Sequence, residues 1–158
     1  NITTSVVLAG IQLSDSCTFM YNYILNTTSI VLMNSYGKIS PTDGPYFSRY
    51  TGPTVMANIT IRTVNWDTPI SFYLTATIYD NNNVPVAYVR TPQTILPAPS
   101  GDPLSSNKQT YLIALNLPSY AFVGPAKLYI NLFNGDPAAL STPLCPEQSA
   151  NLVIDAKQ

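Results

Sequence analysis

Residues 54–66 read TVMANITIRTVNW, and this stretch decides the fold class. Apolar and polar side chains alternate along it, so that one face holds Val55, Ala57, Ile59 and Ile61 and the other holds Asn58, Thr60 and Arg62. A period of two with one apolar face is typical of a β-strand that covers a core on one side only.

Similar patterns recur along the rest of the chain. Residues 70–80 (ISFYLTATIYD) and 84–90 (VPVAYVR) flank the turn sequence DNNN and predict a β-hairpin. We expect further strands at 17–25, 29–36, 110–117, 127–133 and 151–156, and loops at 37–53 and 91–108, which are rich in turn residues. With no amphipathic helix and 14 prolines, the chain is predicted to be all-β, an immunoglobulin-like or jelly-roll β-sandwich with an extended N-terminal strand.

The composition excludes several classes of function. Only 9% of the 158 residues are charged, against a typical share of about 25%, and the net charge is −1. The basic residues are scattered singly, so we expect no nucleic-acid partner, and no apolar run approaches the roughly 20 residues of a membrane span. The chain has no histidine, which excludes histidine-based hydrolases, and most of its aspartates stand in turn sequences. We therefore expect no enzymatic activity, no cofactor and no metal.

Three glycosylation sequons point to an extracellular protein. They begin at Asn1, Asn26 and Asn58, and each has threonine two residues later. Attached sugars would also solubilise a surface that carries so little charge. We expect a secreted glycoprotein that carries N-linked glycans and whose signal peptide has been removed.

The two cysteines, Cys17 and Cys145, are far apart in the sequence. In an oxidising compartment they would form one long-range disulfide, which we predict. The alternative is two unpaired buried thiols. Two cysteines without a histidine do not complete a zinc shell.

The first thirteen residues, NITTSVVLAGIQL, are apolar on both sides of an extended strand. Such a strand needs cover on both sides. One interpretation is an ordinary first strand within its own sandwich. The other is β-augmentation, in which the strand inserts into the next copy of the same protein and builds a head-to-tail homopolymer. The residues that would be buried by insertion are Ile2, Val6, Val7, Leu8, Ile11 and Leu13.

Three further features have two interpretations each. The eleven tyrosines either form a sugar-binding platform or replace phenylalanine at half-exposed positions of a sheet. The sequence DNNN either supplies oxygens to calcium or simply forms a hairpin turn, and it lacks the glycine and the acid of an EF-hand loop. Lys38 and Lys127 are candidates for a crosslink to asparagine, which would need a buried acid nearby.

The processed N-terminal strand, the Asn-x-Thr sequons and the charge-poor body rich in Tyr, Asn and Thr resemble subunits of archaeal extracellular filaments. Within these, the chain resembles the thin surface threads of thermoacidophilic archaea, which assemble by donor-strand complementation. The resemblance implies a structural subunit for adhesion and biofilm formation, located in a cell-surface filament. Residues 1–13 would be the donor strand and residues 14–158 the β-sandwich head domain. The resemblance also implies glycans on Asn26 and Asn58, whereas a sugar on Asn1 would have to clear the neighbouring subunit. The alternative is a self-contained extracellular module that binds carbohydrate or belongs to a surface layer.

Overall fold

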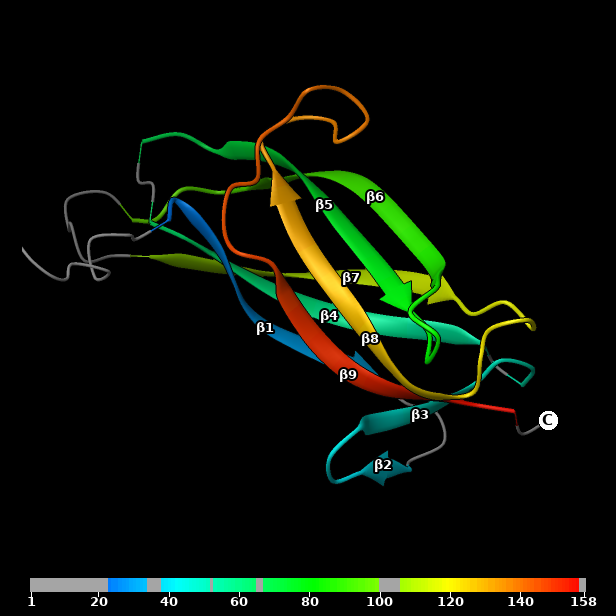
Figure 1. The fold of residues 1–158 in the computed structure, drawn as a ribbon. Coiled ribbons are helices and arrows are strands. Elements are labelled where there is room, and N and C mark those ends of the chain that lie inside the picture. The colour runs from blue at the N-terminus through cyan, green and yellow to red at the C-terminus, as the bar shows by residue number, and fades with distance from the viewer. Residues whose placement is uncertain (1–22, 34–37, 52, 65–66, 100–105, 157–158) are drawn as a thin grey trace, which may run out of the picture.

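The computed structural model describes residues 23–33, 38–51, 53–64, 67–99 and 106–156. These residues form two β-sheets that pack face to face, so the predicted all-β sandwich is confirmed (Figure 1). The described strands are β1 (Leu25–Met33), β2 (Ile39–Ser40), β3 (Gly44–Ser48), β4 (Thr54–Thr63), β5 (Ile70–Tyr79), β6 (Pro85–Ile95), β7 (Asn107–Asn116), β8 (Gly124–Phe133) and β9 (Gln148–Asp155). None of the described segments is a helix of the length and apolar character needed to cross a membrane.

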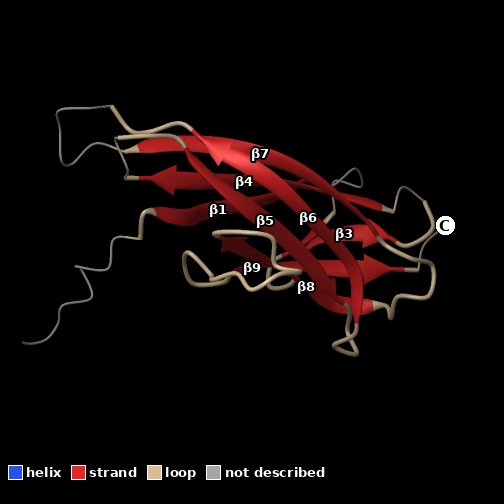
Figure 2. Ribbon diagram, turned by 90° about the horizontal axis from the view of Figure 1, so that it is seen from above, coloured by secondary structure: helices blue, strands red, loops and turns tan. Residues whose placement is uncertain are grey.

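The two sheets differ in size. The small sheet has the order β1-β4-β7, and the large sheet has the order β2-β3-β9-β8-β5-β6. Neighbouring strands are antiparallel except β3 and β9, which are parallel. Figures 1 and 2 show that β5 and β8 run diagonally across β4 and β7, so the strands of the two sheets cross at an angle.

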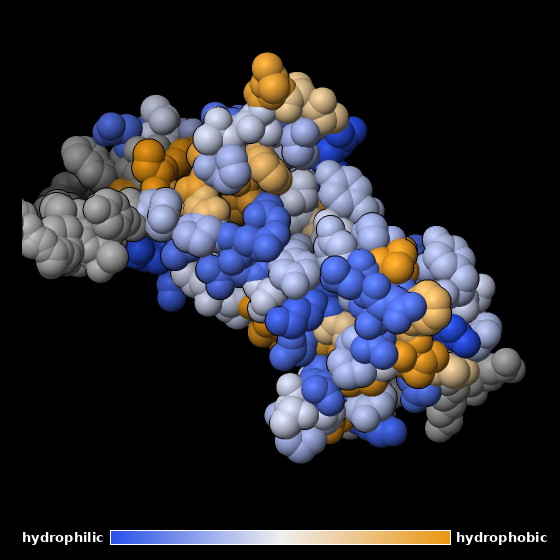
Figure 3. Space-filling view, in the orientation of Figure 1, coloured by the Kyte–Doolittle hydropathy of each residue, from blue (hydrophilic) through white to orange (hydrophobic). Residues whose placement is uncertain are grey.

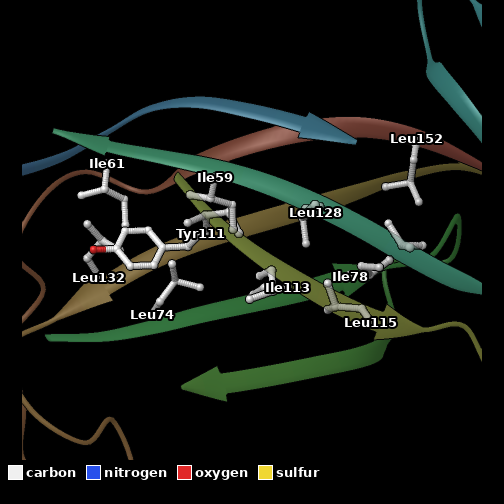
Figure 4. Close-up of a cluster of buried hydrophobic side chains, with 14 of the residues drawn as sticks. Ile59, Ile61, Leu74, Ile78, Tyr111, Ile113, Leu115, Leu128, Leu132 and Leu152 are labelled. Atoms are coloured by element: carbon white, nitrogen blue, oxygen red, sulfur yellow. The ribbon is translucent and has the colours of Figure 1, made fainter. Parts of the chain in front are cut away.

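The core lies between the inner faces of the two sheets. The predicted apolar face of β4 is fully buried, and β5 and β8 bury every second residue against it. Figure 4 shows how the two sheets meet, with Ile59, Ile61, Tyr111, Ile113 and Leu115 on the small sheet and Leu74, Ile78, Leu128, Leu132 and Leu152 on the large one. Each fully buried aliphatic side chain contributes about 1.5–3 kcal/mol relative to exposure, which makes this interface the main source of stability.

The hairpin predicted around DNNN is confirmed. It joins β5 to β6, and Asp80 organises its turn. One carboxylate oxygen of Asp80 accepts hydrogen bonds from the backbone N–H groups of Asn82 and Val84, at 2.9 and 3.0 Å. The other oxygen accepts from the N–H of Phe122, at 3.1 Å, in the loop between β7 and β8. Asp80 is buried, and these three bonds account for its carboxylate.

The predicted link between two strands at 26–28 is wrong, because β1 runs through it. The register of β1 on β4 shifts between Thr27 and Ser29, which is a β-bulge at Thr28. Before the bulge Leu25 and Thr27 face the core, and after it Ile30 and Leu32 do. A bulge reverses the phase of the alternation, so one strand looked like two.

Two predicted loops were too long. Residues 37–53 contain β2 and β3, whose pairing leaves a tight turn at Ser40–Gly44. β6 continues to Ile95, four residues after the start of the predicted loop at 91. It contains Pro85 and Pro92, which an edge strand tolerates because its outer N–H groups have no ladder partner.

Candidate functional site

One edge of β1 has no neighbouring strand among the described residues. Within the described residues β1 pairs with β4 alone, so its other edge has no ladder partner there, although the Thr27 backbone hydrogen-bonds to the Cys145 thiol. An edge of this kind is the template onto which another extended segment adds.

The core is incompletely covered beside this edge. Leu25 and Thr27, in the first half of β1, are buried. Ile30 and Leu32, in the second half, face inward and pack against the core cluster but remain half-buried. By contrast the inward residues of β4, in the middle of the same sheet, are fully buried. The second half of β1 therefore has room for apolar cover beyond what the described residues supply.

A second strand edge faces β1 across a narrow slot. β9 pairs with β3 only from Val153 to Asp155. Among the described residues, the earlier part of β9 therefore pairs with β8 on one side and has no partner on the other. A hollow of about 180 Å³ separates this part of β9 from β1. It is lined by Thr27, Thr28, Ser29, Ile30, Gln148 and Ser149. The slot thus lies between two strand edges, one from each sheet, that have no ladder partner in the described part of the chain.

Both described sequons lie on the outer face of the small sheet. Asn58, on the central strand β4, is in register with Val31 on one side and Leu112 on the other. Asn26, on β1, is in register with Arg62. Both asparagines are half-buried, and the expectation that Asn58 lies on the solvent-facing side of its strand is confirmed.

Apolar side chains surround Asn58. Val31 is 54% exposed and Leu112 is 55% exposed, although both lie in the middle of a sheet face. The Asn58 side-chain amide lies 3.7 Å from the Met33 sulfur. A glycan on Asn58 would extend from the centre of this apolar patch.

Cys145 is buried in the segment that leads into β9 and lies against Thr27 of β1. Burial raises the pKa of the Cys145 thiol, and hydrogen bonds from Thr27 lower it by less. Its predicted partner Cys17 lies outside the described residues, so the disulfide stays a prediction. The sequon at Asn1 and the predicted donor residues Ile2, Val6, Val7, Leu8, Ile11 and Leu13 also lie outside them.

The aspartates expected in turns make hydrogen bonds within those turns. The backbone N–H of Asp43 donates to the Ser40 hydroxyl at 3.1 Å. Asp136 accepts from the N–H of Ala138 at 2.9 Å and also pairs with Arg90 at 2.9 Å. Together with Asp80, these carboxylates have structural partners.

The free edge of β1 could not be found from the sequence. Each strand is recognised by its own alternation, but which edge lacks a neighbour depends on the order of strands in the sheet. The only local signal is that β1 has neither a proline nor a charged residue.

No family model matches this chain, and no curated protein matches it. One solved structure to which it is similar is a crystal structure of a protein from Archaeoglobus fulgidus. The two are 14% identical over 80% of this chain and 97% of the other, with a TM-score of 0.37. So distant a likeness supports no conclusion about this chain.

Proposed function

We propose that this protein is the structural subunit of an extracellular filament, and that residues 1–13 of one copy add to the β1 edge of the next. The observation that carries the proposal is the slot between β1 and β9. Among the described residues its two strand edges have no ladder partner, and Ile30, which lines it, is only half-buried, as is Leu32 further along β1.

The donor segment has the properties that this slot requires. Residues 1–13 are apolar on both faces, so one face would cover Ile30 and Leu32 while the other packs outward against the neighbouring sheet edge. Burial of six apolar side chains would contribute on the order of 10 kcal/mol before the cost of association. Thirteen extended residues span about 43 Å, enough to bridge two domains.

Donor and acceptor surfaces are different, so the contact is head-to-tail. Each added copy presents a new free edge, and a filament results when the rotation between copies does not close a ring. Glycans on Asn26 and Asn58 would then cover the outer face of the small sheet, and the filament would act in adhesion and biofilm formation, as in the surface threads that the sequence resembles.

The same edge has a competing occupant, the chain's own N-terminal segment. Residues 14–24 are enough to form a loop that returns residues 1–13 antiparallel to β1. In that case the protein is a self-contained module, and the slot is filled within each copy.

Deletion of residues 1–13 separates the two. For a filament subunit, the truncated chain is expected to stay folded and monomeric, to form no filaments in electron micrographs, and to bind a synthetic peptide of residues 1–13. A peptide of the same composition in scrambled order is the matched control and is expected not to bind. A full-length chain that remains monomeric at high concentration, together with a truncated chain that unfolds, would overturn the proposal.

A further inference from the structure

The outer face of the large sheet carries a row of aromatic side chains that assembly through β1 does not use. Along β5 and β8 the inward residues are buried, so the alternate residues face outward. The outward aromatic residues of β5, β6 and β8 on this face are Tyr73, Tyr79, Tyr88, Tyr129 and Phe133. Figure 3 shows the same side of the molecule, with largely hydrophilic colours across its middle and smaller hydrophobic patches towards its ends.

Two hollows meet on this face. The larger has a volume of about 380 Å³ and the smaller about 300 Å³. They share Tyr79, Tyr129 and Asn83 as lining residues. The two tyrosine rings lie 5.5 Å apart and are nearly perpendicular, at 86°, so they present ring faces in two directions. The pair thus divides one groove into two adjacent subsites.

Polar groups line the walls of both hollows. Asp43, Lys127 and Asn151 line the larger one, and Glu147 lines the smaller. Glu147 is held in place because the Asn131 amide donates to its carboxylate at 2.7 Å. Within the described residues, the side-chain amides of Asn83 and Asn151 and the ammonium of Lys127 have no protein hydrogen-bond partner. These groups are therefore available to a ligand.

The backbone holds the walls of the groove in fixed positions. Gly44, next to Asp43, has φ +89°, and a Cβ there would collide with the backbone carbonyl of Asn151. The turn before β3 can thus lie directly against β9. At the other end Asn83 has φ +61° at the tip of the hairpin that Asp80 fixes. A groove held in this way needs little ordering when a ligand binds.

We propose that this groove binds a neutral oligosaccharide, with one sugar ring on each side of the Tyr79–Tyr129 pair. Sugar rings stack their C–H faces on aromatic rings, and their hydroxyls both donate to carboxylates and accept from amides and ammonium groups. The groove offers these chemistries in alternation. Three carboxylates, Asp43, Asp80 and Glu147, against one lysine give no excess of positive charge, which disfavours phosphate and nucleic acid.

The oligosaccharide has two possible sources, and the test separates them. The full chain, produced without glycosylation, is titrated calorimetrically in one arm with hexasaccharides of glucose, mannose and N-acetylglucosamine. In the other arm it is titrated with the N-glycans released from the glycosylated protein. Binding in the first arm indicates a foreign polysaccharide, and binding in the second indicates the glycans of a neighbouring copy. No heat with any of these sugars overturns the proposal.

Variants locate the site. Tyr79→Ala and Tyr129→Ala are each expected to weaken binding at least about tenfold, because each removes a stacking surface. Tyr120→Ala is the matched control, since Tyr120 is 73% exposed in the loop between β7 and β8 and lines neither hollow. Asn83→Ala and Asn151→Ala leave the aromatic pair intact and are expected to weaken binding by less. Unchanged affinity in both tyrosine variants, with melting temperatures preserved, contradicts this location. These titrations measure sugar binding and not filament formation. Their outcome therefore does not depend on whether the proposed filament assembly is correct.

Discussion

The edge strands on the two sides of this sandwich, β1 and β6, differ in their content of proline and charged residues. β1, at the edge of the small sheet, reads LNTTSIVLM and has neither proline nor charge. β6, at the edge of the large sheet, reads PVAYVRTPQTI, with two prolines and an arginine that pairs with Asp136. Prolines and charges prevent an edge strand from pairing with another chain. The contrast teaches that β6 carries the residues that protect an edge strand against addition and that β1 does not.

The two edges also differ in how the sheets are joined beside them. Near β6 the sheets are tied together, because the Tyr111 hydroxyl on β7 donates to the Thr94 carbonyl on β6 at 2.9 Å. The Tyr111 ring also packs edge-on against Phe72, with centroids 5.7 Å apart. Near β1 the contact is between Thr27 and the Cys145 thiol, and a hollow of about 180 Å³ lies beside it.

The largest expected effect comes from a charge placed at the β1 edge. Ile30→Lys puts an ammonium in the wall of the slot, where the donor strand would have to cover it, and we expect filament formation to be abolished. The cost to the fold is expected to be about 1 kcal/mol, since the position is half-buried and lysine can extend to water. Electron microscopy and denaturant unfolding measure the two effects.

Val89→Lys is the matched control at the other edge. Val89 is also half-buried and packs against the core from an edge strand, here β6. We expect a similar loss of stability and normal filaments. Equal loss of assembly in both variants would mean that destabilisation, and not the β1 edge, accounts for the result.

A second experiment removes the protection of β6. Replacing Pro85 and Pro92 together by valine restores two backbone N–H groups and raises the β-propensity of the strand. We expect the double variant to associate side by side, measured as increased light scattering at a fixed concentration and as bundled filaments in micrographs. Unchanged scattering would show that the prolines do not protect this edge. The single variants are expected to lie between the double variant and the natural chain.

The alternation of side chains was sufficient to predict the strands whose period is unbroken. β4 and β5 coincide closely with their predicted spans, and the turn between β5 and β6 follows from DNNN. β1 was missed as one strand because the bulge at Thr28 moves its inward residues from odd to even positions. β2 and β3 were missed because they are short and held by neighbours, β3 by parallel pairing with β9.

The candidate sites also fall into two groups, those fixed by the pattern of a single strand and those that depend on which strands are neighbours. The outward position of Asn58 follows from the alternation of its own strand, so the sequence predicts it. The slot beside β1 and the tyrosine groove depend on which strands are neighbours. Tyr79 and Tyr129 are far apart in the sequence, and only the pairing of β5 with β8 brings their rings together. A single sequence contains no local signal for such long-range pairing.

The smallest expected effect tests the tie near β6. Burial raises the pKa of Tyr111 to about 12, above its ordinary value of about 10. Above pH 10 the unfolded chain loses this proton while the folded chain keeps it, so the contribution of Tyr111 to stability is complete below pH 10 and is lost as the pH rises towards 12.

Tyr111→Phe removes both the hydroxyl and its titration. Below pH 10 the variant is expected to be less stable by about 1 kcal/mol, the typical value of one hydrogen bond. Between pH 10 and 12 the difference from the natural chain should shrink and then reverse in sign, because only the natural chain is destabilised by ionisation of this phenol in the unfolded state. Denaturant unfolding at pH 8, 10 and 11.5 measures this change, and a constant difference at all three values would show that the phenol does not titrate as a buried group. Because β1 lies on the opposite side of the small sheet from β7, filament formation at neutral pH is expected to be the same in both proteins.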